Sequence, residues 1–177
     1  VVATEEATGS EALTAALEGA RLVAVLTQAQ DPGNAGTIIR AADAAGADAV
    51  VLVRGSVDPT APKVVRSTAG SLFHLPVVTG VALDDAVTAL HNAGLTVLAA
   101  DERGDFDLFE AESLLEAPSA WLLGNEAHGL PSEALSRADA VVSIPIYGKA
   151  ESLNVAAAAA VCLYASARAQ AQHSGRS

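Results

Sequence analysis

Three loops of this chain carry glycine and polar residues of the kinds that bind ligands or do chemistry. The first loop reads DPGNAGTIIR over residues 31–40. Its Asn34 is a suitable N-cap for the helix that follows, and a capping role alone would account for it. Arg40 lies one to two turns into that helix, beside Asp43, where it can either face a ligand or remain solvated. The glycines do not satisfy the G-x-G-x-x-G pattern, which disfavours a generic nucleotide-binding protein.

The second loop reads LLGNEAHGLP over residues 122–131. Glycine at the end of a strand, here Gly124, lets the backbone approach a ligand closely, and Asn125 follows it. Glu126 and His128 could suggest acid–base chemistry or a metal pair. One carboxylate and one imidazole are too few ligands for a metal ion, so we predict no metal site.

The third loop reads IPIYGKAESLN over residues 144–154 and leads into a long alanine-rich helix. Ser152 or Asn154 would cap that helix, and capping would explain one of the two without any catalytic role. The helix is apolar almost all round through Leu163, which predicts burial on every side, against its own sheet and a second subunit. We assign Cys162 to this packing rather than to catalysis.

Apolar, β-branched runs alternate with helical stretches, and this pattern predicts an α/β fold with a parallel sheet flanked by helices. We predict strands at residues 22–26, 49–53, 76–78, 96–100, 120–123 and 140–144. We predict helices near residues 35–45, 62–69, 83–92, 132–137 and 154–169, and one more before residue 18. Ligands bind beyond the carboxyl ends of such strands, so the three loops and the loop after Ala100 should form one site.

Length and composition exclude several classes of protein. With 177 residues, of which 51% are hydrophobic, the chain can bury the core of one compact domain and is not intrinsically disordered. No apolar run approaches the ~20 residues that cross a bilayer, so we predict no membrane-spanning segment. A single cysteine excludes internal disulfide bonds. The net charge of -11 opposes a broad nucleic-acid surface, although a few local cations remain compatible with RNA.

Together, the three loops resemble the signature motifs of the SpoU, or TrmH-type, branch of the SPOUT methyltransferases. Residues 34–40 resemble the first motif, 124–126 with 129–131 the second, and 144–145 with 152–155 the third. The resemblance covers about residues 22–167. It implies a SPOUT-type fold with a C-terminal deep trefoil knot, and a homodimer whose active site is completed across the interface.

The resemblance also implies transfer of a methyl group from S-adenosylmethionine to a ribose 2'-hydroxyl in RNA. No metal is needed, because the sulfonium already activates the methyl group. Ribosomal RNA is the expected target, transfer RNA is the alternative, and the cytoplasm is the expected location. The family's cofactor contacts correspond to Gly124, Asn125, Ile144, Leu153 and Ala100.

The same resemblance assigns catalysis to Arg40, Asn34, Glu126, Ser152 and Asn154. Arg40 would lie nearest the reacting ribose, either as the base or as a clamp on the neighbouring phosphate. Because a guanidinium is normally always protonated, the clamp is the safer role. Asn34 and Asn154 would orient Arg40 or the ribose. Glu126 would hold the first motif in place, and Ser152 would form a hydrogen bond near the cofactor or substrate.

The resemblance further suggests a division of the chain. We expect residues 1–20 to be a linker or the tail of a missing RNA-binding domain, 21–170 the catalytic domain and 171–177 a C-terminal tail. If the missing domain carries the basic surface, the catalytic domain needs few cations of its own. Those available are Arg40, Arg54, Lys63, Arg66 and Lys149. The alternative to an enzyme is a non-catalytic RNA-binding dimer module of the same fold.

Overall fold

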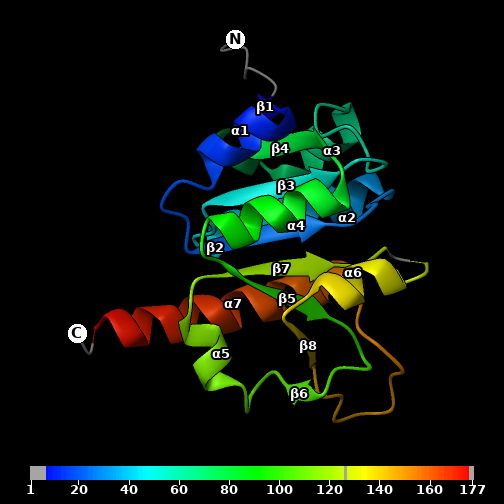
Figure 1. Cartoon of the computed structure of the whole chain (residues 1–177). Helices are drawn as coiled ribbons and strands as arrows, with labels where there is room; N and C mark the ends of the chain where they lie inside the picture. Colours follow the sequence, from blue (N-terminus) through cyan, green and yellow to red (C-terminus); the bar gives the residue numbers. More distant parts are fainter. Residues whose placement is uncertain (1–6, 126, 176–177) are drawn as a thin grey trace.

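The computed structural model describes residues 7–125 and 127–175, which contain one eight-stranded sheet (Figure 1). The strands are β1 (Ala7–Thr8), β2 (Leu22–Leu26), β3 (Ala49–Val53), β4 (Val77–Val81), β5 (Thr96–Ala100), β6 (Phe106–Asp107), β7 (Ser119–Leu123) and β8 (Ala140–Ser143). Their order in the sheet is β1-β4-β3-β2-β7-β5-β8-β6, and all neighbouring pairs are parallel. The carboxyl ends of the strands therefore lie along one edge of the sheet.

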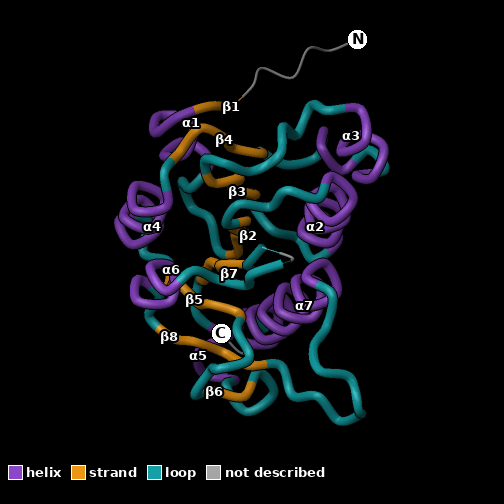
Figure 2. Tube along the Cα trace, turned by 90° about the vertical axis from the view of Figure 1, so that its right-hand side faces the viewer, coloured by secondary structure: helices purple, strands orange, loops and turns teal. Residues whose placement is uncertain are grey.

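Helices cover both faces of this sheet, which Figure 2 shows edge-on. One face carries α1 (Gly9–Ala16), α4 (Leu83–Asn92) and α6 (Ser132–Arg137). The other face carries α2 (Pro32–Ala44), α3 (Pro62–Thr68) and α7 (Val155–Ser174). The short helix α5 (Glu112–Glu116) packs against α7, and the 3-10 helix η1 (Ser71–Phe73) packs against α2 and α3. The predicted α/β class, with a parallel sheet flanked by helices, is confirmed.

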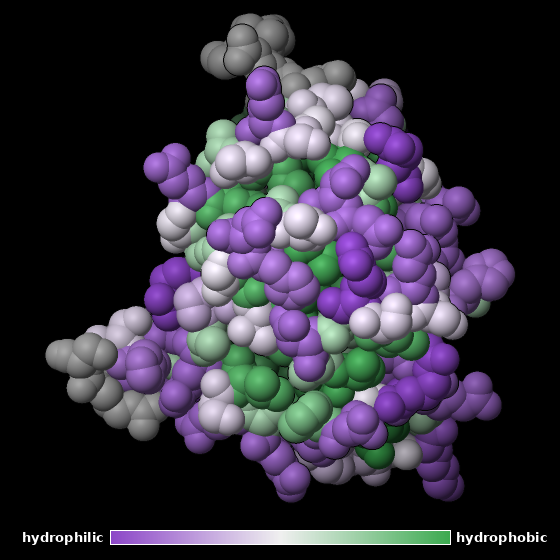
Figure 3. All heavy atoms as spheres, in the orientation of Figure 1, coloured by the Kyte–Doolittle hydropathy of each residue, from purple (hydrophilic) through white to green (hydrophobic). Residues whose placement is uncertain are grey.

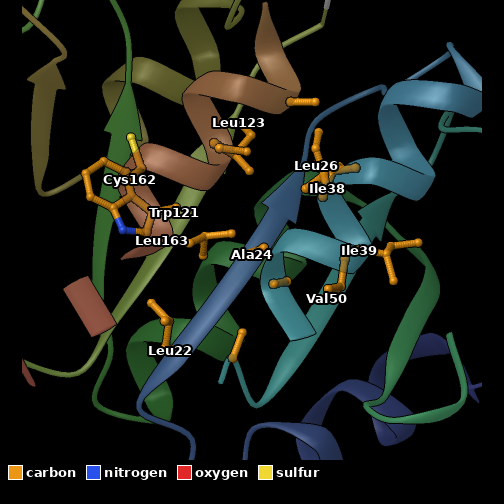
Figure 4. Packing of buried hydrophobic residues seen from close by; sticks show 14 of the residues in the cluster. Leu22, Ala24, Leu26, Ile38, Ile39, Val50, Trp121, Leu123, Cys162 and Leu163 are labelled. Atoms are coloured by element: carbon orange, nitrogen blue, oxygen red, sulfur yellow. The ribbon is translucent and has the colours of Figure 1, made fainter. Parts of the chain in front are cut away.

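Strands β2, β3 and β7 are buried along their whole length, which explains why their sequences are continuously apolar. On one face of the sheet, side chains of β2, β7, α2 and α7 meet in a core that includes Ile38, Trp121 and Leu163 (Figure 4). Trp121 is fully buried, and its Nε1 donates a hydrogen bond to Ser166 Oγ at 2.9 Å. This bond ties the last helix to the centre of the sheet.

Within one chain, α7 is buried on the side that faces its own sheet, as predicted. Within the chain, its buried residues form one stripe, made of Ala156, Ala159, Cys162, Leu163, Ser166, Ala169 and Gln170. The other side is partly open: Tyr164 is 53% exposed, and its hydroxyl donates a hydrogen bond to the carbonyl oxygen of Ala44 in α2 at 3.2 Å. Cover of the remaining surface of α7 by a second subunit stays a prediction. Cys162 is buried as predicted, and burial raises the pKa of its thiol to about 12.

The start of α2 differs from the prediction. The helix begins at Pro32 rather than Ala35, because Asp31 is its N-cap and Asn34 lies inside the first turn. The backbone N–H of Asn34 donates a hydrogen bond to Asp31 Oδ1 at 2.7 Å. Proline suits the first position of a helix, so the pair Asp31-Pro32 is the stronger starting signal. The capping explanation for Asn34 is therefore wrong.

Both ends of the described chain join the fold. Within residues 1–20, where we expected a linker or tail, β1 pairs with β4, and α1 packs against β4 and α4. Leu13 and Leu17 are buried there. At the other end, α7 continues to Ser174, inside the expected tail 171–177. The division of the whole protein into domains stays a prediction.

Four short elements were not predicted: β1, β6, α5 and η1. They are two to five residues long, which is too short to show a periodic pattern. β4 runs on to Val81, and β8 ends at Ser143, before the predicted Ile144. Among the helices of the described residues, none combines the length and the apolar character that crossing a bilayer requires.

Candidate active site

A cavity of about 590 Å³ lies at the carboxyl ends of β5, β7 and β8. Its walls come from the loops after these strands and from the first turn of α7. Six predicted site residues line it: Ala100, Gly124, Asn125, Ile144, Ser152 and Leu153. The parallel sheet thus brings the second and third loops together with the loop after β5. Two other cavities, beside β4 and between α1 and α4, contain none of the predicted site residues.

The second loop requires glycine at position 124. A Cβ atom there would lie 2.5 Å from the carbonyl carbon of Gly129 and 2.7 Å from the nitrogen of Leu130. Both are backbone atoms that cannot move aside. The main chains of Asn125 and Gly129 exchange two hydrogen bonds, of 3.0 and 2.9 Å, which close the loop on itself. The loop therefore places main-chain atoms in the cavity wall.

Asn125 connects the second loop to the end of β2. Its Nδ2 donates a hydrogen bond to the carbonyl oxygen of Gln28 at 2.9 Å, and its Oδ1 accepts one from the Ala127 amide at 2.8 Å. Gln28 has a φ of 57°, a left-handed conformation that costs a residue other than glycine ~1–3 kcal/mol. A cavity residue thus helps to hold a strained backbone, and such strain clusters at functional sites.

Charged side chains give the cavity an acidic character. Asp101, Glu102 and Glu151 line it, against one guanidinium, Arg103, and one imidazole, His128. The Nε and Nη2 atoms of Arg103 donate to the two carboxylate oxygens of Asp101 at 2.7 and 2.9 Å. These hydrogen bonds hold the pKa of the Asp101 carboxyl below its ordinary value. The excess of carboxylates favours a positively charged ligand.

Asn154 is the N-cap of α7. Its Oδ1 accepts hydrogen bonds from the amides of Ala156 and Ala157, at 2.9 and 3.4 Å. Ser152, the other capping candidate, precedes the helix and lines the cavity. The alternative between the two is therefore settled in favour of Asn154.

The same Asn154 connects the third loop to the first. Its Nδ2 donates a hydrogen bond to Asn34 Oδ1 at 3.3 Å, across 120 residues of sequence. The residues on either side of it, Leu153 and Val155, line the cavity. The start of α2 is thereby attached to the cavity wall.

Arg40 does not line this cavity. It is exposed, and its guanidinium has no bonding partner in the ranges 7–125 and 127–175. Gly36, Arg40 and Asp43 share one face of α2, because residues three and four apart are neighbours on a helix. Gly36 packs against Ser67 of α3, and Asp43 Oδ2 bonds to His74 Nδ1 at 2.7 Å. Arg40 therefore faces α3 and η1, and Asp43 pairs with the histidine instead of with Arg40.

Two kinds of site residue remain. Glu126 lies outside the described residues, so its role stays a prediction. The sequence prediction did not name the cavity residues Asp101, Arg103 and Glu151, although Asp101 directly follows a predicted strand and Glu151 lies in the third loop, which were the available signals. Among the described residues, no group of three or more His, Cys, Asp or Glu side chains could hold a metal ion.

Comparison with known proteins decides the family. A family model described as the SpoU rRNA Methylase family matches residues 21–164, most of the chain. The chain belongs to the SpoU rRNA methylase family. The SpoU match contains every residue that we predicted for the site, including Arg40 and Glu126.

Two SpoU relatives illustrate the likeness in sequence. The 23S rRNA (guanosine(2553)-2'-O)-methyltransferase RlmP of Bacillus subtilis is 42% identical over 151 residues, which cover 84% of this chain and 58% of that protein. The 23S rRNA (uridine(2479)-2'-O)-methyltransferase of Streptomyces viridochromogenes is 42% identical over 142 residues, which cover 77% of this chain and 49% of that protein. This chain therefore spans only about half of each relative's length.

A solved structure shows the same likeness in three dimensions. The SpoU methyltransferase AviRb from Streptomyces viridochromogenes, in complex with the cofactor AdoMet, superposes with a TM-score of 0.76 and 35% identity. The match covers 97% of this chain and 64% of that one.

Proposed function

We propose that this chain is the catalytic domain of an S-adenosylmethionine-dependent RNA (ribose-2'-O)-methyltransferase. The observation that carries the proposal is the cavity at the ends of β5, β7 and β8, whose walls contain the second and third SpoU motifs. Relatives named as 2'-O-methyltransferases of 23S rRNA support the reaction type.

The cavity suits S-adenosylmethionine in size, wall chemistry and charge. Its volume of about 590 Å³ falls within the ~300–1,000 Å³ of small-molecule sites. Main-chain atoms of Gly124, Ile144 and Leu153 can form hydrogen bonds to an adenine edge, while aliphatic side chains exclude water. Glu102 and Glu151, which form no ion pair within the described residues, complement a cationic ligand. When bound, the cofactor supplies a methyl group that its sulfonium has activated.

The protein itself must position the ribose hydroxyl and make its proton easier to lose. Arg40 carries a permanent charge and a fork of N–H donors that matches an RNA phosphate. Such a clamp aligns the hydroxyl and polarises it through the neighbouring phosphate. The bond between Asn34 and Asn154 fixes the start of the helix that carries Arg40. Ser152 in that wall offers a hydroxyl to cofactor or ribose, and Glu126 completes the proposed set.

We infer that the protein works as a homodimer whose active sites are completed across the interface. Arg40 does not line the cavity of its own chain, which supports a role in the cavity of a second copy. The third loop and α7 also expose apolar side chains that a second copy could cover, namely Ile146, Tyr147, Leu153 and Tyr164.

A C-terminal trefoil knot is part of the same proposal. β8 lies between β5 and β6 in the sheet, although β5 and β6 follow each other in sequence, so the chain that joins them crosses β8. At the crossing, a Cβ atom on Gly104 would lie 2.5 Å from the nitrogen of Ser143. Beyond β6, α5 packs against α7. The segment that runs from β5 to α5 thus contacts β8 and α7, the two elements that a knot would thread through it. Such knots are rare among protein folds.

Ribosomal RNA is the proposed substrate. The proposed location is the cytoplasm, because ribosomal RNA is found there. Transfer RNA is the second candidate, because one neighbour is a structure described as giving insights into the 2-OH methylation of C/U34 on tRNA. It superposes with a TM-score of 0.75 at 32% identity, and the match covers 85% of this chain and 96% of that one.

Transfer of tritiated methyl groups from S-adenosylmethionine to RNA tests the proposal. The full-length protein should label the ribose 2'-oxygen of one nucleotide in ribosomal RNA. Label on a base would overturn the assigned chemistry, and label only on transfer RNA would select the second candidate. RNA binding without cofactor binding or transfer would identify a non-catalytic module.

The variant Arg40→Ala should lower methyl transfer by ~10²–10³-fold, the loss expected when a group that stabilises the reacting centre is removed. Cofactor binding and the unfolding midpoint should not change, because Arg40 is exposed and lies outside the cavity. Arg137→Ala is the control: it removes an exposed arginine of α6 and its ion pair with Asp84, far from the proposed machinery, and should transfer normally. Normal transfer by Arg40→Ala would refute both proposed roles of this residue.

A further inference from the structure

The helices on the two faces of the sheet carry opposite charge. On the face of α1, α4 and α6, exposed carboxylates prevail, and Figure 3 shows hydrophilic residues gathered over α4 on this face. The charged residues of these three helices are Glu11, Asp84, Asp85, Glu133 and Arg137. On the other face, α2, α3 and η1 hold three cations, Arg40, Lys63 and Arg66, against one carboxylate, Asp43. The acidic chain therefore has a basic surface of its own.

Asp43 does little to offset these cations. Its carboxylate bonds to His74 Nδ1 at 2.7 Å, and hydrogen bonds from His74 and Ser71 hold its pKa below the ordinary value. Lys63 and Arg66 are exposed and form no ion pair within the described part of the chain. Being three residues apart, they project from the same side of α3. Their charge is available to an anionic partner.

An exposed aromatic ring completes this surface. Phe73, at the end of η1, is 60% exposed, and η1 packs against both α2 and α3. The chain reaches η1 through Ala69 and Gly70, whose φ angles of 49° and 94° make a sharp left-handed turn. Ala69 is the strained residue of this turn, and the exposed ring of Phe73 lies on the short helix that follows it.

We propose that the outer surface of α2, α3 and η1 binds single-stranded RNA, with phosphates on Lys63 and Arg66 and a base stacked on Phe73. Cations that follow a backbone, together with an aromatic ring that accepts any base, are the features of single-strand binding sites. Arg40 lies on the same surface, so RNA held there leads toward the proposed phosphate clamp. This inference rests on the proposed function and adds to it the docking surface and the stacking residue.

The stacking role is tested with a fluorescein-labelled oligoadenylate and an abasic oligonucleotide of equal length, by fluorescence anisotropy on the full chain. Phe73→Leu should weaken oligoadenylate binding about tenfold, because an apolar side chain remains but the π-face is lost. Binding of the abasic strand should not change. Phe109→Leu is the matched control, since Phe109 is 57% exposed beyond β6, and it should bind both strands normally.

The phosphate contacts are tested by the salt dependence of binding. Lys63→Ala and Arg66→Ala should weaken the binding of both oligonucleotides. Each variant should also reduce the slope of log K against log salt concentration by about 0.7. Arg137→Ala, on the opposite face, removes the same charge and should leave the slope unchanged. Equal binding by all variants, or no binding by the wild-type chain, overturns the docking surface.

Cofactor binding by the same samples separates the two proposals. All variants should bind S-adenosylmethionine like the wild type, because none of the altered residues lines the cavity. Wild-type protein that binds no cofactor refutes the proposed function. If the wild type binds the cofactor but Phe73→Leu and Arg66→Ala bind RNA as tightly as the wild type, only the docking surface is refuted.

Discussion

At the scale of single residues, Asp101 and Arg103 form a bidentate ion pair in the cavity wall. Both carboxylate oxygens accept from the guanidinium, and the Asp101 side chain is only 7% exposed, whereas that of Arg103 is 61% exposed. Solvent screens so exposed a cation, which limits what the pair adds to stability. The main consequence is that Asp101 stays ionised in the cavity.

This pair predicts a specific response to acid. The pKa of Asp101 in the folded chain lies below its ordinary value of 3.8, so its carboxylate stabilises the fold above that pH. The contribution is lost as the pH falls through the lowered pKa. Urea unfolding should therefore show a smaller loss of stability below that pH in Asp101→Asn than in the wild type. An equal loss in both would contradict the assignment.

Some residue contacts were open to prediction and others were not. Gly124, Ile144 and Leu153 could be placed in one site, because loops at the carboxyl ends of parallel strands must meet there. The bond between Asn34 and Asn154 depends on how α2 and α7 pack, and no pattern in either segment contains that information. The same holds for the strained Gln28, whose backbone Asn125 contacts.

At the scale of elements, the crossing of the β5–β6 loop over β8 is the tightest fit near the site. A Cβ atom at Gly104 would lie 2.5, 2.6 and 2.8 Å from backbone atoms of Ser143, Val142 and Val141. Because β8 continues into the third loop, this contact fixes where that loop leaves the sheet.

Gly104→Ala should therefore destabilise the fold by ~1–3 kcal/mol, the usual cost of forcing extra atoms into a packed region. Gly148→Ala is the matched control, since a Cβ atom there meets nothing within 4 Å, and its stability should match the wild type. Thermal unfolding of the two variants makes the comparison. Equal stability would show that the β5–β6 loop can move away from β8.

The sequence predicted best the elements with a clear hydrophobic pattern. β2, β3, α4 and α6 have the predicted bounds, because uninterrupted apolar strands and amphipathic helices leave clear patterns. β6 escaped prediction because its two residues form a strand only by pairing with β8. Which residues of α7 face its own sheet could not be predicted, because alanine occurs on both sides of the helix.

At the scale of the whole molecule, the separation of Arg40 from the cavity matters most. Within one chain, Arg40 lies outside the cavity. In the proposed homodimer, the cavity of one chain therefore needs an arginine from the other for methyl transfer. A dimer in which Arg40 of the partner subunit completes the cavity would join the two. No feature of a single sequence could show this arrangement, because it depends on the relative position of two copies.

Mixed dimers test this arrangement. Ala158 lies in the cavity wall, so Ala158→Phe should block the cavity and abolish transfer, and Arg40→Ala should abolish it by another route. Co-expression of the two inactive variants should restore transfer, since each mixed dimer would contain one intact cavity opposite one intact arginine. A mixture that stays inactive, although mass spectrometry detects mixed dimers, would place Arg40 and the cavity of one chain in the same active site.

Titration calorimetry with S-adenosylmethionine tests most directly whether the cavity at the ends of β5, β7 and β8 is the cofactor site. The wild-type chain should bind one cofactor molecule per cavity, and Ala158→Phe should abolish binding. Ala157→Phe should bind normally, because Ala157 is exposed on the same turn of α7 and lies outside the cavity wall. Undiminished binding by Ala158→Phe, or no binding by the wild type, would contradict the account.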